Sequence, residues 1–270
     1  MAGLFDLEFH EKKIKEYQPT LAKLDLVIDW EMFRETIEKA LYVEPKGAGG
    51  RPPFDKIMMF KILILQKYYN LSDEQTEFQI NDRTSFKQFL GLKIGDTIPD
   101  EKTIWHFKEQ LANKDLSKSL FEMFAVALMD KGIIAKEGSI VDATFVDVPK
   151  QRNSKEDNAD IKKGAVPLKF GKKDKNGKQS KLCQKDTDAR WMTKSGEKHF
   201  GFKDHINADE KTKLITKYSV TSAAPHDSTE IENIVDETDN RLHADSAYRS
   251  KEIEEHLKAI ECESFVHEKG

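Results

Sequence analysis

Hydrophobic residues in the first half of the chain recur at helical spacing. In residues 29–42, apolar side chains return every three or four positions after Asp29, a residue that suits a helix N-cap. Residues 57–65 are apolar on almost every side, but Lys61 interrupts them and the run is too short to cross a bilayer. These patterns predict amphipathic helices packed around a buried one.

Three short helices are predicted to follow in series, in residues 71–80, 82–91 and 99–111. Ser72 and Gln75 have the spacing of a capping box at the first of them. The series is similar to a helix-turn-helix unit, although helices of a packed bundle are the favoured alternative. We therefore predict a helical region over residues 1–132, with DNA-end recognition as its hypothesised role.

The pattern changes after this region, because β-branched and apolar residues dominate residues 138–148 and predict a central strand. Residues 198–209 and 213–224 read as a β-hairpin joined by a polar turn. A short strand ending near Asp245 and a helix over residues 250–260 come next. Residues 133–270 are thus expected to form a mixed α/β domain.

Two aspartates are placed unusually in these predicted strands. Asp142 lies within the central strand and Asp245 lies at the end of the later one. If the strands are neighbours, the two carboxylates raise each other's pKa unless a cation sits between them, and Mg²⁺ prefers such oxygen ligands. The alternative is that each aspartate caps a turn or pairs with a lysine.

Charge is distributed unevenly along the chain. Its net charge is −4, yet residues 150–200 contain 15 Lys and Arg against 7 Asp and Glu, which suits a surface that meets polyanions. The alternative is an ordinary solvated loop. The candidate phosphate contacts of this basic insertion are Arg152, Lys162, Lys163, Lys172, Lys173 and Arg190.

The remaining candidate chemistry is limited. Two cysteines, Cys183 and Cys262, lie far apart and outside any metal-binding pattern, which argues against a zinc ribbon or a disulfide framework and favours a reducing, cytoplasmic location. His226 and Asp227 could act as an acid–base pair, but capping of the next helix by Asp227 or Ser228 is favoured.

Several long blocks carry a resemblance to a known family. They include "GRPPFDKIMMFKILILQKYYNLSDEQTEFQINDRTSFKQFLGL", "IVDATFVDVPKQRN", "QKDTDARWMTKSGEKHFGFKDHINAD" and "HADSAYRS". In this order they resemble bacterial insertion-sequence transposases of the fifth insertion-sequence family, from about residue 50 onward. The resemblance implies a DDE catalytic domain of the ribonuclease H-like type, a mixed sheet preceded by the helical region.

The same resemblance implies roles for two residues. Asp142 corresponds to the first acid of the family's triad and Asp245 to the second, so both are expected to be catalytic and to bind Mg²⁺ (or Mn²⁺). The third acid of the family, a glutamate on a helix beyond the last strand, has no counterpart in this sequence. The chain is therefore expected to be C-terminally truncated, without the final helix, and impaired as a catalyst.

The implied function is DNA transposition. It comprises binding of double-stranded DNA at terminal inverted repeats, metal-dependent cleavage and strand transfer to target DNA, by a homodimer or larger synaptic assembly. The alternative hypothesis is a non-catalytic DNA-binding remnant that occupies transposon ends.

Overall fold

The chain divides into two compact units, residues 1–124 and 125–270, in a computed structural model. The division lies within one helix, α8, and the boundary predicted from the sequence lies two residues beyond its end. The structure describes residues 6–17, 19–44, 47, 52–135, 137–165, 167, 172–173, 179–180, 186–194 and 196–267.

The first unit is helical throughout its described elements, as its hydrophobic spacing predicts. In chain order these are α1 (Asp6–Tyr17), α2 (Pro19–Val27), the 3₁₀ turn η1 (Trp30–Phe33), α3 (Arg34–Ala40), α4 (Lys56–Tyr68), α5 (Asp73–Asp82), α6 (Thr84–Leu90), α7 (Glu101–Asn113) and α8 (Leu116–Asp130).

Helix α4 forms the centre of the core of this unit. Its residues Ile62 and Leu65 are fully buried and pack in one cluster with side chains from η1, α3 and α5 to α8. The prediction of a buried helix is confirmed. The capping box is also confirmed, since Ser72 Oγ accepts from the Gln75 amide at 3.1 Å and Gln75 Oε1 accepts from the Ser72 amide at 3.0 Å.

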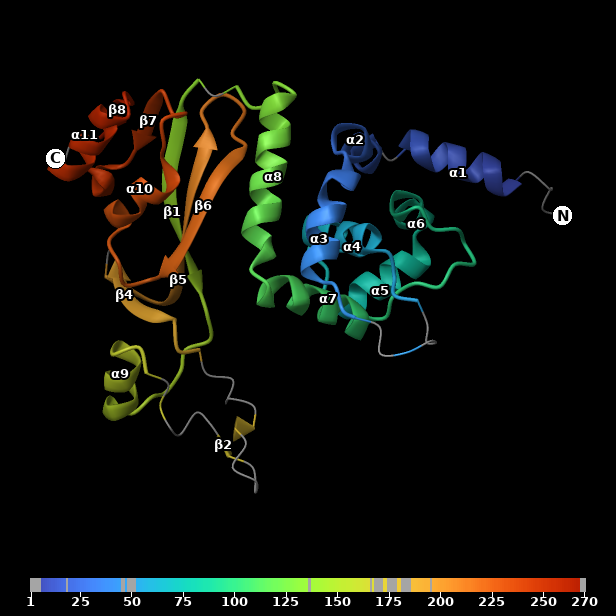
Figure 1. Ribbon diagram of the computed structural model, residues 1–270, viewed down its shortest axis with the longest axis horizontal. Coiled ribbons are helices and arrows are strands. Elements are labelled where there is room, and N and C mark those ends of the chain that lie inside the picture. Colours follow the sequence, from blue (N-terminus) through green and yellow to red (C-terminus); the bar gives the residue numbers. More distant parts are fainter. Residues whose placement is uncertain are drawn as a thin grey trace. The chain divides into compact units, whose positions relative to one another are not determined.

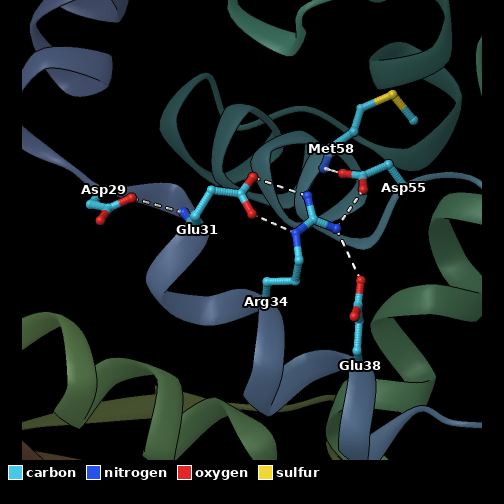
Figure 2. Close-up of polar contacts among 6 residues, drawn as sticks. All are labelled: Asp29, Glu31, Arg34, Glu38, Asp55 and Met58. Atoms are coloured by element: carbon cyan, nitrogen blue, oxygen red, sulfur yellow. Dashed lines mark hydrogen bonds and ion pairs between the residues drawn. The ribbon is translucent and has the colours of Figure 1, made fainter.

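One arginine connects the start of α4 to α3, as Figure 2 shows. Asp55 caps α4 by accepting from the Met58 amide at 2.9 Å, and Arg34 donates to the same carboxylate at 2.7 Å. Arg34 also donates to Glu38 at 3.0 Å and to Glu31. Burial raises the pKa of Asp55, but the hydrogen bonds from Arg34 and the Met58 amide, together with the charge of Arg34, keep that pKa below its usual value.

The second unit contains the strands. In chain order its elements are β1 (Ser139–Asp147), α9 (Lys155–Lys162), β2 (Lys172–Lys173), β3 (Gln179–Ser180), β4 (Arg190–Lys194), β5 (Glu197–Asp209), β6 (Ile215–Ser222), η3 (Asp227–Glu230), α10 (Ile231–Ile234), β7 (Arg241–Ala244), η4 (Ser246–Tyr248), α11 (Lys251–Ala259) and β8 (Glu263–Val266).

Its main sheet is mixed and has β1 near the middle. The order is β4-β5-β1-β7-β8, with β6 also paired to β5. Strand β1 is antiparallel to β5 and parallel to β7, and β7 is parallel to β8. Both the predicted central strand and the predicted hairpin of β5 and β6 are therefore confirmed, and the unit is mixed α/β.

One face of this sheet carries the hydrophobic core. Helices α10 and α11 lie beside β1 and β7 (Figure 1), and Ile231, Ile234 and Leu257 form one buried cluster with Val141 and Leu242. Side chains alternate along β1, so Val141 is buried whereas the next residue, Asp142, is exposed. Asp142 thus projects away from the core.

A glycine marks the place where the basic insertion leaves and rejoins the sheet. Asp147, the last residue of β1, pairs with Gly201 of β5, and Arg190, the first residue of β4, pairs with Gly201 from the other side. Gly201 has φ +156°, and a Cβ there would overlap the carbonyl oxygen of Val146. The insertion therefore begins and ends at one level of the sheet.

An ion pair between Lys217, near the start of β6, and Asp236 predicts a pH dependence. Burial raises the pKa of Asp236, but its bonds with Lys217 and Thr238 lower it to about 2. Because the folded-state pKa lies below the ordinary 3.8, this carboxylate stabilises the unit above pH 4, and the contribution is lost as pH falls toward 2. We expect Lys217→Met to make the unfolding free energy depend less on pH between pH 2 and 5, as measured by urea unfolding. An unchanged dependence on pH would contradict the assignment.

Among the helices that the structure describes, none is both long enough and apolar enough to cross a membrane.

Candidate functional site

Asp142 lies within β1, and Asp245 directly follows β7, the strand that is parallel and adjacent to β1. Ser139 of β1 pairs with Leu242 of β7, and Ile140 pairs with His243. The same sequence offset separates Asp142 from Asp245, so the register of the ladder brings the two residues to one level. Both side chains are exposed. Strand adjacency, the condition for the predicted carboxylate pair, is met.

Each carboxylate makes a local hydrogen bond that fixes one of its oxygens. Asp142 Oδ1 accepts from the Ala143 amide at 2.7 Å. Asp245 is the N-cap of η4, and its Oδ1 accepts from the Ala247 amide at 2.8 Å. The alternative role as a turn cap is thus also correct for Asp245, and it leaves the second oxygen of each carboxylate to other partners.

The pair lacks a cationic side chain. Within the described part of the chain, no Lys, Arg or His forms an ion pair with Asp142 or Asp245. Two exposed carboxylates on adjacent strands are hard oxygen ligands, and Mg²⁺ is commonly held by one or two carboxylates while waters and substrate phosphate oxygens complete its shell. The residues present therefore fit a Mg²⁺ ion.

No third ligand joins the pair among the residues that the structure describes, since no three His, Cys, Asp or Glu residues gather there to hold a metal. Two other acids lie on neighbouring elements. Asp204 of β5 pairs with Thr144 of β1, and burial raises its pKa. Asp227 of η3 forms an ion pair with Lys203.

That lysine, Lys203 of β5, was not singled out by the sequence. Its side chain is 1% exposed, and its Nζ donates to Asp227 Oδ1 at 2.7 Å and to the Pro225 carbonyl at 2.6 Å. Phe145, opposite it on β1, places its ring 5.6 Å from the same Nζ. The buried ion pair therefore involves β5 opposite Phe145, three residues beyond Asp142 on β1.

The predicted capping by Asp227 or Ser228 is wrong. His226 is the N-cap of η3, and its Nδ1 accepts from the Ser228 amide at 3.3 Å. Asp227 instead points into the unit to meet Lys203, because an unpaired lysine would be costly to bury there.

The candidate phosphate contacts differ in their surroundings. Arg152, Lys162 and Lys163 are exposed, the last two at the end of α9. Arg190 is half-buried, and its guanidinium donates to the carbonyls of Thr187, Ala189 and Ile161, which links β4 to α9. Lys172 and Lys173 form β2, but their side chains lie outside the described residues.

The comparisons with known proteins cover both units. Residues 134–264 match the family model described as a transposase DDE domain, and residues 8–110 match the one described as a transposase domain (DUF772). Asp142 and Asp245 both lie within the first match. No solved structure matches the chain.

Proposed function

Because this chain belongs by family to the DDE-type transposases, we propose that Asp142 and Asp245 are its catalytic, metal-binding carboxylates. The observation that carries the proposal is that Asp142, within β1, and Asp245, directly after the adjacent parallel strand β7, share one level of the sheet and have no ion pair with a cationic side chain. The mixed sheet with its helices agrees with a ribonuclease H-like fold. We further propose that the chain belongs to the fifth insertion-sequence family.

The proposed reaction is cleavage of DNA at the terminal inverted repeats of an insertion sequence, followed by strand transfer. Bound Mg²⁺ would act as a Lewis acid on the phosphodiester and would help a water or a 3′ hydroxyl to attack. The protein's own part is to hold two carboxylate oxygens, one on each strand, toward that position. The reduced activity expected from the missing third acid stays a prediction.

DNA binding is proposed for both units. Ile80, Phe86, Ile104 and Phe107 of the first unit lie in one core, which a packed bundle, the favoured alternative to a helix-turn-helix, would also contain. Trp105 nevertheless stands 51% exposed on α7, where a DNA partner could reach it. Synapsis of two ends would require a dimer or a larger assembly.

The test is a cleavage and gel-shift assay on labelled DNA carrying the terminal repeats, with Mg²⁺ and with EDTA. Cleavage that needs Mg²⁺ and disappears in Asp142→Asn supports the proposal. Binding without cleavage would favour the non-catalytic remnant. If the chain does not bind DNA even at low salt, both hypotheses fail.

A charge deletion tests the basic insertion. We expect Lys162→Ala with Lys163→Ala to weaken binding to all DNA sequences and to lower the slope of log K against log salt by about 2, because each phosphate contact contributes about 0.9. Lys211→Ala is the matched control, since Lys211 is 64% exposed and pairs with Glu137 elsewhere in the unit. An unchanged slope in the double variant would mean that α9 does not face DNA.

A further inference from the structure

Trp191 lies on β4, the strand at one end of the main sheet. Its indole is 50% exposed, although tryptophan side chains are usually buried in large part. Exposed aromatic rings in a basic segment are typical of surfaces on which nucleobases stack. Trp191 belongs to the basic insertion, residues 150–200, so its indole is a candidate contact for a base.

Two neighbours hold the indole in place. Phe200 of β5 pairs with Trp191, is 4% exposed, and places its ring centroid 5.0 Å from that of Trp191 at an interplanar angle of 40°. Arg190, the preceding residue, donates to the carbonyls of Thr187 and Ile161 and so anchors the start of β4. An aromatic ring that is already held in place loses less conformational entropy when a ligand stacks on it.

The register of the sheet places Trp191 on the face that carries Asp142. Asp142 pairs with Ile206, and directly paired residues of an antiparallel ladder project to the same face. Phe200 lies six residues before Ile206 in the same strand, so alternation puts Phe200 on that face too. Trp191, the partner of Phe200, therefore shares the face of Asp142.

The residue next to Phe200 supports this alternation. The ring of His199 stacks on that of Phe145 of β1, with centroids 4.3 Å apart. Phe145 lies four residues after Val141 in the same strand, so both belong to the face that carries the hydrophobic core. His199 thus lies on the core face, and Phe200 lies on the opposite one.

Two exposed lysines lie near the indole. Lys150 Nζ is 5.8 Å from the Trp191 ring centroid, within the range of a cation–π contact. Lys198 pairs with Thr193, two residues after Trp191, so it is a diagonal neighbour of Trp191 on the same face. Ammonium groups beside an aromatic ring complement a ligand with phosphates next to a flat ring, which is the chemistry of an unpaired nucleotide.

Resting on the proposed function, we propose that Trp191 stacks on an unpaired base of the DNA strand that is cleaved at Asp142 and Asp245, while Lys150 and Lys198 contact adjoining phosphates. Six residues of strand separate the level of Asp142 from that of Trp191, which is about 20 Å at ~3.4 Å per residue. B-form DNA covers this length in about six nucleotide steps of ~3.4 Å. The stacked base therefore belongs to the DNA that flanks the cleaved bond.

The experiment measures the binding of two fluorescein-labelled strands to the full chain by fluorescence anisotropy, in EDTA and at low salt. One strand is oligothymidylate and the other is an abasic oligonucleotide of the same length, which keeps the phosphates and lacks the bases. The ratio of their dissociation constants therefore reports stacking, and we expect the parent chain to bind oligothymidylate about 10-fold more tightly. Equal affinity for the two strands, or binding of neither, would overturn the inference.

Trp191→Leu should abolish this preference and leave the affinity for the abasic strand unchanged, because leucine still covers Phe200 but has no aromatic face. Trp191→Phe should keep most of the preference, since a phenyl ring can still stack. Tyr42→Leu is the matched control, because Tyr42 is a 72% exposed aromatic residue of the first unit, and it should bind as the parent does. A preference in Trp191→Leu equal to that of the parent would refute the role of Trp191.

Asp142→Asn, titrated with Mn²⁺, separates this inference from the proposed function. If Trp191→Leu loses the preference and Asp142→Asn keeps full Mn²⁺ affinity, the stacking surface stands and the proposed metal site fails. If Asp142→Asn loses Mn²⁺ and Trp191→Leu keeps the preference, the metal site stands and the stacking surface fails.

Discussion

Asp142→Asn and Asp245→Asn are each expected to weaken Mn²⁺ binding by at least about 100-fold and to remove any Mg²⁺-dependent DNA cleavage, because each loses the charge of a direct ligand. Asparagine can still accept the local bonds from the Ala143 and Ala247 amides through Oδ1, so the strand end and the η4 turn should survive. Isothermal titration with Mn²⁺ and the cleavage assay measure the two effects.

The matched control is Asp100→Asn. Asp100 is another exposed aspartate whose side chain accepts from a backbone amide, that of Thr103 at 2.7 Å, but it caps helix α7 in the helical unit. Its Mn²⁺ affinity should equal that of the parent. If Asp142→Asn and Asp100→Asn bind Mn²⁺ with the same affinity, the pair Asp142 and Asp245 is not a metal site.

Lys203→Met is expected to destabilise the second unit by about 3–5 kcal/mol, because it leaves the Asp227 carboxylate in a largely buried position without its cation. Adding Asp227→Leu should recover most of this loss, since apolar side chains of similar size replace buried ion pairs at little cost. Amide hydrogen exchange of β5 and β7, followed by mass spectrometry, reports the unfolding free energy of this unit separately from that of the helices.

Lys211→Met provides the comparison for an exposed pair. Lys211 and Glu137 are 64% and 55% exposed, so the loss should be below about 1 kcal/mol. Equal losses in Lys203→Met and Lys211→Met would show that burial of the Lys203 pair contributes nothing to the stability of the sheet.

The local patterns were sufficient to predict much of the fold. Helical spacing and the capping box located α4 and α5, and the run of β-branched residues around Asp142 located β1. Adjacency of the strands that carry Asp142 and Asp245 was only a condition of the predicted carboxylate pair, and the parallel pairing of β1 with β7 meets that condition. These features depend on residues close together in sequence or on a strand order common in α/β folds.

The surroundings of the site could not be predicted in the same way. Lys203 stands between Phe202 and Asp204 in a strand, and alternation alone does not reveal that its partner is Asp227 on a later turn. Tyr248 looks like an ordinary core aromatic, because only folding buries its hydroxyl without a hydrogen-bond partner among the described residues. Both depend on contacts between distant segments.

The pairing of Asp147 and Arg190 with the same glycine has a consequence for how such proteins vary. The basic insertion between them leaves and rejoins the sheet at one level. Doubling the length of a flexible loop with fixed ends costs only about 0.6 kcal/mol. Relatives could therefore lengthen or trim this segment without moving either carboxylate. The number of residues between the two aspartates should drift during evolution, while strand register preserves their meeting.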